Sequence, residues 1–227
     1  MSSRSAGRPG KHRVLAAHQI LDTALALVDE RGTDALTVRG VAAALDVAPN
    51  ALYTYFPNRD ALRAALVEHL LGELDGVKLP ADWPTALRHL AGALRALLAR
   101  HPGAVPLFVA GPMFGPHGLH TGERALALLA GAGFTPTAAA RALYTVLAYT
   151  LGFAAMDAAE LTPGAPADMD TRVAQRRTAF EAVPAADYPH THAAASVMAT
   201  YVTDTQFRSG LDTILAGLAR SAASPSR

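Results

Sequence analysis

Residues 37–60 read TVRGVAAALDVAPNALYTYFPNRD, and this segment contains two short helical patterns joined by a tight turn. In the first pattern, apolar residues recur at helical spacing: Val38, Val41, Ala42 and Leu45. Thr37 stands directly before them, where its hydroxyl can accept an amide hydrogen bond as an N-cap. Two helical patterns separated by only a few residues predict a helix-turn-helix.

The second pattern begins at Pro49, which a first helical turn tolerates because the missing amide hydrogen has no partner there. Residues 46–48 form the predicted turn, and Leu52 and Phe56 face inward. The outward face then carries small, amide, hydroxyl and phenol groups, which suit contacts in a DNA groove: Ala48, Asn50, Ala51, Tyr53, Thr54 and Tyr55. An ordinary helical hairpin with two solvated tyrosines is the alternative, since this geometry also occurs in proteins that do not bind DNA.

Over residues 14–71 the chain resembles the DNA-binding domain of the tetracycline-repressor (TetR) family of bacterial transcriptional regulators. Three motifs carry the resemblance, and their order, spacing and position near the N-terminus all agree. They are Thr-x-Arg-x-Val-Ala at 37–42, Leu-Tyr-x-Tyr-Phe at 52–56 and Asn-Arg-Asp-Ala-Leu at 58–62.

The resemblance also implies roles for individual residues of this motif. Arg39 is expected to contact guanine, and Pro49, Asn50 and Ala51 to influence sequence preference. The residues expected to contact mainly phosphates are Tyr53, Thr54, Tyr55 and Arg59. With two residues of the N-terminal arm, the complete predicted DNA-contacting set is Lys11, Arg13, Thr37, Arg39, Ala48, Pro49, Asn50, Ala51, Tyr53, Thr54, Tyr55 and Arg59.

The formal net charge is +1, so DNA affinity must depend on where the charges lie rather than on their total. Four basic residues precede the first acidic residue, Asp22: Arg4, Arg8, Lys11 and Arg13. They lie in a stretch that contains serine, glycine and proline. Residues 1–13 are therefore predicted to be a disordered basic arm that contacts phosphates when DNA is bound.

The chain contains no cysteine, which excludes disulfides, thiolate metal sites and cysteine nucleophiles and is compatible with a reducing cytoplasm. We find no zinc-protease signature, phosphate loop, dinucleotide fingerprint or nucleophile elbow. No signal peptide follows Met1. The uncharged segment 142–156 is short and carries two tyrosines and two threonines, so it predicts a buried helix. We expect a cytoplasmic protein without enzymatic activity, cofactor, metal or membrane contact.

The helical patterns and the helix-breaking residues between them predict an all-α protein with two domains. Residues 14–75 form the DNA-binding domain, in which a first helix over 14–31 precedes the helix-turn-helix and a fourth helix over 59–74 follows it. A break over 76–80 opens a helical ligand-binding and dimerisation domain over 76–222, and residues 223–227 form a disordered tail. Its predicted helices cover residues 83–100, 121–132, 137–160, 171–182, 193–201 and 204–220.

The helices over 137–160 and 204–220 offer more apolar surface than one small helical domain needs, which favours a shared interface. Sequence motifs in both resemble the C-terminal domain of tetracycline repressors. The resemblance implies a homodimer in which these two helices pair with their copies as a four-helix bundle. The predicted interface residues are Leu143, Phe153, Phe207, Leu211, Ile214, Leu215 and Leu218.

In the tetracycline repressors that the chain resembles, a drug–magnesium chelate is held by a histidine after the sixth helix, by polar groups on the fifth helix and by a carboxylate of the partner subunit. An ungapped alignment puts Phe108 at the histidine and Met156 at the carboxylate, and phenyl cannot ligate a metal. We therefore expect a small-molecule pocket that is mostly apolar, although several of its residues could simply be core. Its predicted residues are Asp75, Leu90, Leu94, Phe108, Met113, Phe114, Tyr144, Leu147, Leu151 and Asp157.

The sequence thus predicts a homodimeric regulator, most often a repressor in this family, that leaves a palindromic double-stranded operator when a hydrophobic effector binds. A ligand-independent DNA-binding protein whose C-terminal domain only dimerises is the alternative. A helical small-molecule-binding protein or enzyme that never contacts DNA is a third class. A cavity near Phe108 and Tyr144 would separate the first from the second, and salt-sensitive, sequence-specific DNA binding would exclude the third.

Overall fold

The computed structural model describes residues 16–111, 113–161, 166 and 168–223, and within these ranges the chain forms helices and no strands. The all-α prediction is confirmed. The helices are α1 (Ala17–Arg31), α2 (Val38–Ala44), α3 (Pro49–Tyr53), α4 (Arg59–Leu71), α5 (Trp83–Arg100), α6 (Val105–Ala110), α7 (Pro116–Gly131), α8 (Pro136–Ala159), α9 (Met169–Glu181), α10 (Pro189–Ala193), α11 (Ala195–Met198) and α12 (Asp204–Ala223). Three 3-10 turns lie between them, η1 (Thr33–Ala35), η2 (Gly72–Leu74) and η3 (Pro102–Ala104). The predicted basic arm with Lys11 and Arg13, and tail residues 224–227, lie outside the described residues.

Thr37 caps α2 as predicted, and two further local signals fix helix ends in the N-terminal domain. The Thr37 hydroxyl accepts the Gly40 amide at 2.9 Å, and the Asn58 side chain accepts the Ala61 amide at 2.8 Å. Gly32 ends α1 with φ of 75°, a conformation that favours glycine. These three signals place the boundaries of α1, α2 and α4, and thereby the orientation of the helix-turn-helix.

One hydrophobic core holds α1–α4 and continues without a break into the C-terminal half. Leu97, Leu98 and Phe108, from α5 and α6, are buried in the same cluster as the residues of α1 and α4. A Cβ added at Gly103 would overlap with the carbonyl oxygen of Val28, so the backbones of η3 and α1 lie in direct contact. The two predicted domains therefore share a core rather than joining through a linker.

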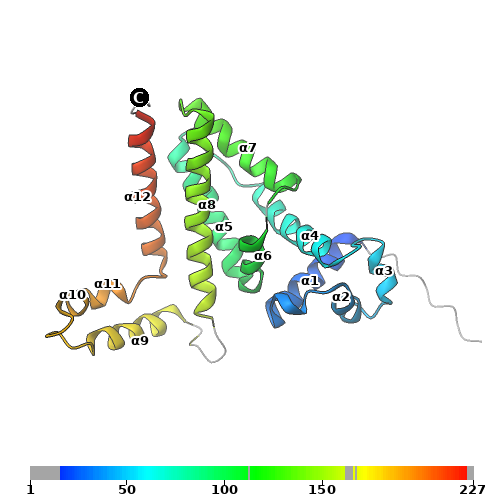
Figure 1. Ribbon diagram of the computed structural model, residues 1–227, viewed down its shortest axis with the longest axis horizontal. Helices are drawn as coiled ribbons and strands as arrows, with labels where there is room; N and C mark the ends of the chain where they lie inside the picture. Colours follow the sequence, from blue (N-terminus) through cyan, green and yellow to red (C-terminus); the bar gives the residue numbers. More distant parts are fainter. Residues whose placement is uncertain (1–15, 112, 162–165, 167, 224–227) are drawn as a thin grey trace, which may run out of the picture.

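A second core fills the space between α5, α7, α8 and α12. In Figure 1, α8 and α12 run antiparallel beside each other, while α1–α4 lie at the opposite end of the molecule and α9–α11 extend beyond the ends of both long helices. Glu160, at the end of α8, accepts hydrogen bonds from Arg176 and Tyr201 and so connects this extension to the body. Helix α8 is the one described helix long and apolar enough to cross a membrane. It packs against α5, α7 and α12.

The predicted dimer residues need correction, because most of them are buried inside the protomer. Phe153, Phe207, Leu211 and Leu215 are at most 6% exposed within the second core. Ile214 and Leu218 are half-buried against the same cluster, and Leu143 lines a cavity. The four buried side chains thus stabilise the protomer by packing on α5 and α8, and they are not exposed to a partner.

Candidate DNA-reading surface and small-molecule cavity

The helix-turn-helix presents a continuous exposed face. Asp46 adopts the left-handed conformation with φ of 54°, and the Val47 amide donates to the Ala42 carbonyl at 3.0 Å, so the chain reverses within a few residues. Leu52 and Phe56 anchor α3 in the core. The side chains that point outward include Arg39, Ala48, Pro49, Asn50, Ala51, Tyr53, Thr54 and Tyr55. Tyr53 and Tyr55 are 41% and 40% exposed, so their phenol groups are accessible to a partner.

Arg59 differs from the rest of the predicted phosphate-contacting set, because its guanidinium is engaged inside the domain. Nε donates to the Leu36 carbonyl at 2.9 Å and Nη2 donates to the Thr33 carbonyl at 2.8 Å. Nη2 also lies 3.6 Å from the Asp34 carboxylate. Arg59 therefore connects the start of α4 to η1, and these contacts do not support the predicted phosphate grip.

A cavity of about 450 Å³ lies between the end of α4, α5, α7 and α8. Six of the predicted pocket residues line it: Leu90, Leu94, Met113, Phe114, Tyr144 and Leu147. The side chains that complete its wall are mostly apolar as well, among them Leu71, Leu74, Leu87, Leu126, Leu143 and Val146. Its size and character are those of a site for an apolar small molecule.

Four predicted pocket residues lie elsewhere, which corrects the predicted set. Phe108 is 2% exposed in the first core, and Leu151 packs against that core. The Asp75 carboxylate lies 2.6 Å from Nδ1 of His117. Asp157 pairs with Arg95 at 3.0 Å. Each of these side chains is held by intramolecular packing or an ion pair, so none of them lines the cavity.

Helix α7 forms a wall of the cavity that was not predicted from the sequence. Gly118, Thr121 and Gly122 line the cavity, and the hydroxyl oxygen of Thr121 is buried without a hydrogen-bond partner. Small and hydroxyl residues at positions i, i+3 and i+4 share one face of a helix, and this spacing was the signal available in the sequence. Helix α7 begins at Pro116, five residues before the predicted start at 121.

A buried polar cluster lies where α5, α8 and α12 meet. The Arg95 guanidinium carbon lies 4.9 Å from the ring centroids of both Phe153 and Phe207, and Arg95 pairs with Asp157 and Asp204. The Tyr149 hydroxyl donates to the Phe207 carbonyl at 3.0 Å, and burial raises the pKa of this phenol. This cluster fixes α12 on the body of the protein.

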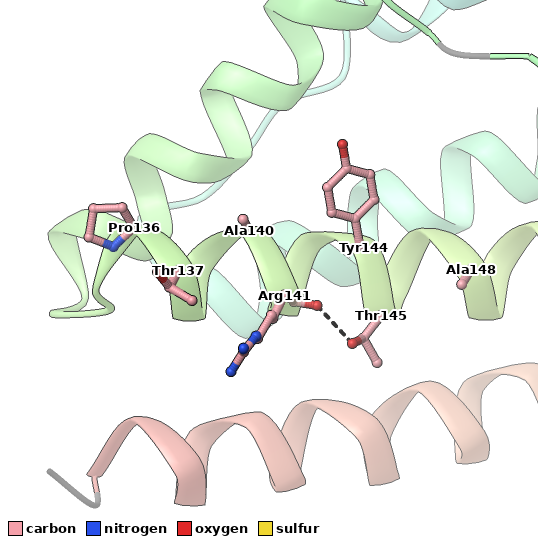
Figure 2. A pocket seen from close by; sticks show the side chains of 7 residues that line it. All are labelled: Pro136, Thr137, Ala140, Arg141, Tyr144, Thr145 and Ala148. Atoms are coloured by element: carbon pink, nitrogen blue, oxygen red, sulfur yellow. Dashed lines mark hydrogen bonds between the residues drawn. The ribbon is translucent and has the colours of Figure 1, made fainter. Parts of the chain in front are cut away.

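The outer face of α8 forms a shallow open groove, which Figure 2 shows from close by. Its lining residues all come from this one helix: Pro136, Thr137, Ala140, Arg141, Tyr144, Thr145 and Ala148. The Thr145 hydroxyl donates to the Arg141 carbonyl at 2.7 Å, so it is satisfied within the helix. Gly152 and Met156 continue this exposed face toward the end of α8.

Within the described ranges, no group of three or more histidine, aspartate and glutamate side chains gathers as a metal site would require. The cavity wall carries one carboxylate, Glu123, and no imidazole. The described geometry thus offers an apolar site and a protein surface for DNA.

Comparison with known proteins agrees with this geometry. Residues 20–66 match the family described as bacterial regulatory proteins, tetR family, and residues 77–222 match the tetracyclin repressor-like C-terminal domain. The tetracycline repressor protein class G of Vibrio anguillarum is 33% identical over 205 residues, which cover 88% of this chain and 92% of that protein.

Two solved structures extend the comparison over the whole fold. A possible TetR family transcriptional regulator from Streptomyces coelicolor A3(2) is 35% identical, with a TM-score of 0.76 over 90% of this chain and 98% of that one. A TetR variant from Acinetobacter baumannii AYE, solved in complex with minocycline, is 28% identical, with a TM-score of 0.70 over 94% of this chain and 97% of that one. The chain belongs to the tetR family of bacterial regulatory proteins, whose members act as dimers on operator DNA.

Proposed function

We propose that this repressor leaves a palindromic operator when a predominantly apolar small molecule binds, without a metal ion, in the cavity between α5, α7 and α8. The observation that carries the proposal is the chemistry of the cavity wall. Of its lining side chains, four carry polar groups: Thr121, Glu123, Tyr144 and Thr150. The free energy of binding would then come mainly from apolar burial, while these few polar groups would orient the effector.

Tetracyclines with magnesium are the competing effectors. The class G relative is named a tetracycline repressor, and the Acinetobacter relative was solved with minocycline. In the ungapped alignment, however, Phe108 and Met156 occupy the positions of the metal-binding imidazole and carboxylate. Phe108 has no atom that binds a metal, and its side chain lies in the first core rather than on the cavity wall.

The direct test is to titrate the operator-bound protein with tetracycline, with magnesium and with chelator, and in parallel with uncharged aromatic compounds of similar size. Release by an aromatic compound that is insensitive to chelator supports the proposal. Release by tetracycline at low concentration that requires magnesium would overturn it.

For operator recognition we propose that Arg39 and residues 49–51 read bases, while the exposed Tyr53 and Tyr55 contact phosphates. Because the apolar face of α12 is used inside the protomer, we assign the dimer contact to the outer face of α8. Ala140, Ala148 and Gly152 on this face are small enough for a second helix to approach closely. The function we propose is that of a cytoplasmic regulator, not of an enzyme. The alternative, a DNA-binding protein without a functional pocket, is not favoured.

A further inference from the structure

The N-terminus of α7 is held by a side chain of the DNA-binding domain. The Glu68 carboxylate, on α4, accepts the backbone amide of His117 at 2.9 Å and that of Gly118 at 3.3 Å. The first amides of a helix have no partner within the helix, and the helix dipole favours negative charge at this end. Glu68 therefore acts as the cap of a helix that lies about fifty residues away in sequence.

The fit between α4 and α7 depends on the absence of a side chain at Gly115. A Cβ added at Gly115 would overlap with Cγ and Cδ of Glu68. The carboxylate can reach the two amides because residue 115 is glycine. A small change in the position of α7 would break the contact between Glu68 and the two amides, because Glu68 packs directly against the backbone at Gly115.

Two further contacts hold α7 to the turn that follows α4. Nδ1 of His117 lies 2.6 Å from the Asp75 carboxylate. Arg124, two turns further along α7, donates to the carbonyl oxygens of Leu74, Asp75 and Val77. Helix α7 is thus attached to the DNA-binding domain over its first half.

The same half of α7 forms a wall of the cavity. Gly118, Thr121 and Gly122 line the cavity, while His117 and Gly118 provide the amides that Glu68 accepts. A molecule that presses on this wall acts on the helix that Glu68 holds. No other described side chain of α4 accepts hydrogen bonds from a helix that lines the cavity.

We infer that α7 transmits cavity occupancy to the DNA-binding domain through the Glu68 carboxylate. This inference rests on the proposed function and names the residues that connect its two sites. When the cavity fills, α7 is displaced; its N-terminal amides carry Glu68 with them, and α4 moves relative to α1. The contact of η3 with α1 at Gly103 stays in place as the fixed point of this motion. The ligand then favours the dimers in which the two helix-turn-helix motifs no longer match successive major grooves.

The test needs no identified effector, because a side chain can occupy the cavity permanently. Gly122 lines the cavity, and no atom lies within 4 Å of the position that a Cβ would take there, so Gly122→Phe inserts a ring from α7 itself. Gly131→Phe is the matched control, since Gly131 lies at the far end of α7, is exposed and has equally open space. Operator affinity is measured for the natural chain, for each single variant, for Glu68→Ala and for Glu68→Ala combined with Gly122→Phe.

We expect Gly122→Phe to lower operator affinity by about tenfold, which is typical of coupling between two sites, and Gly131→Phe to leave it unchanged. In the Glu68→Ala background, Gly122→Phe should have almost no further effect. An equal loss of affinity in both backgrounds would overturn the inference. It would also be overturned if the Gly122→Phe single variant folds and binds the operator as tightly as the natural chain.

Two variants guard against a purely structural explanation. Glu68→Gln keeps one acceptor oxygen and should retain part of the coupling. Gly115→Ala displaces the Glu68 carboxylate without removing it, so it should abolish the coupling as Glu68→Ala does. If circular dichroism shows that Glu68→Ala is unfolded, Gly115→Ala takes its place in the experiment. It is possible to separate this inference from the proposed effector. If no aromatic compound releases the natural protein from its operator, but the Glu68 and Gly122 variants behave as expected, the proposed effector class fails and the transmission route stands.

Discussion

Nε of Arg59 donates a hydrogen bond to the carbonyl oxygen of Leu36 at 2.9 Å, across the junction between η1 and the start of α4. The second bond, to Thr33, satisfies another carbonyl of the same turn. A residue of the DNA-binding motif thus fixes the position of the motif's own last helix. Its contribution to operator binding is therefore expected to be indirect.

Replacement of Arg59 should reveal this structural role. Arg59→Ala removes two charge-assisted hydrogen bonds, so the free energy of unfolding should fall by about 1.5–3 kcal/mol. The salt dependence of operator affinity should change by clearly less than the one unit expected for a lost phosphate contact. Thermal unfolding and affinity at several salt concentrations measure both, with Arg63→Ala on the same helix as control. A full one-unit change without loss of stability would restore Arg59 to the phosphate-contacting set.

Arg39 is expected to read a base. Its side chain is exposed on α2, and a bidentate arginine–guanine pair contributes about 1–3 kcal/mol of discrimination. Arg39→Ala should therefore lose discrimination at one position in each half of the operator. Affinities for matched and singly mismatched operators measure this. If both weaken by the same factor, Arg39 contacts only phosphate.

The Arg95 cluster should be sensitive to the loss of one carboxylate. Arg95 and Asp157 are 13% and 18% exposed, so Asp157→Asn leaves a nearly buried guanidinium with less compensation and should cost about 3 kcal/mol of unfolding free energy. Asp212→Asn is the matched control, because its pair with Arg88 also joins α5 to α12 but is about half exposed. This control should cost about 1 kcal/mol or less. Equal effects in urea unfolding would show that burial does not distinguish the two pairs.

The outer face of α8 should control assembly. Ala148→Glu places like charges on both copies of this face, so the dimer dissociation constant should rise at least about tenfold and operator affinity should fall with it. Sedimentation measures the first quantity and a binding titration the second. Ala130→Glu, on the exposed side of α7, should change neither. Unchanged sedimentation of Ala148→Glu would mean that another face forms the dimer.

Stability should decline at alkaline pH because of Tyr149. Burial raises the pKa of this phenol in the folded protein above its ordinary value of 10.0. Above that pH the unfolded chain loses the proton more readily than the folded protein, so the free energy of unfolding falls as pH rises further. Tyr149→Phe should flatten the decline, measured by urea unfolding between neutral and alkaline pH. Tyr201 contributes in the same direction, since its hydrogen bond to Glu160 raises the pKa, and Tyr201→Phe is measured alongside.

The parts of the structure that follow from local chemistry were predictable from the sequence. The caps Thr37 and Asn58, the stop at Gly32 and the inward positions of Leu52 and Phe56 depend on neighbouring residues only. They therefore yielded the helix-turn-helix, its exposed face and the order of the helices.

The contacts that could not be predicted join residues far apart in the chain. Nothing near Glu68 indicates that it caps a helix that begins at Pro116, and nothing near Arg59 indicates that its partners are the carbonyls of η1. Helical periodicity identified the apolar face of α12 but could not tell whether that face packs inside the protomer or against a second copy. Phe108 was assigned to the pocket by alignment, whereas packing in three dimensions puts it in the core.

The contact of Gly103 with Val28 has a consequence for recombining this protein with its relatives. A chimaera that exchanges residues 1–75 as a cassette would cut through the shared core and bring a foreign α1 against the backbone of η3. To design a biosensor with a new operator preference, residues 97–108 should instead be exchanged together with the N-terminal segment. Alternatively, only the exposed residues of α2 and α3 should be replaced, and the rest of this protein kept. The second design leaves the Gly103 junction and the Glu68 cap untouched, so response to the effector would be inherited along with the cavity.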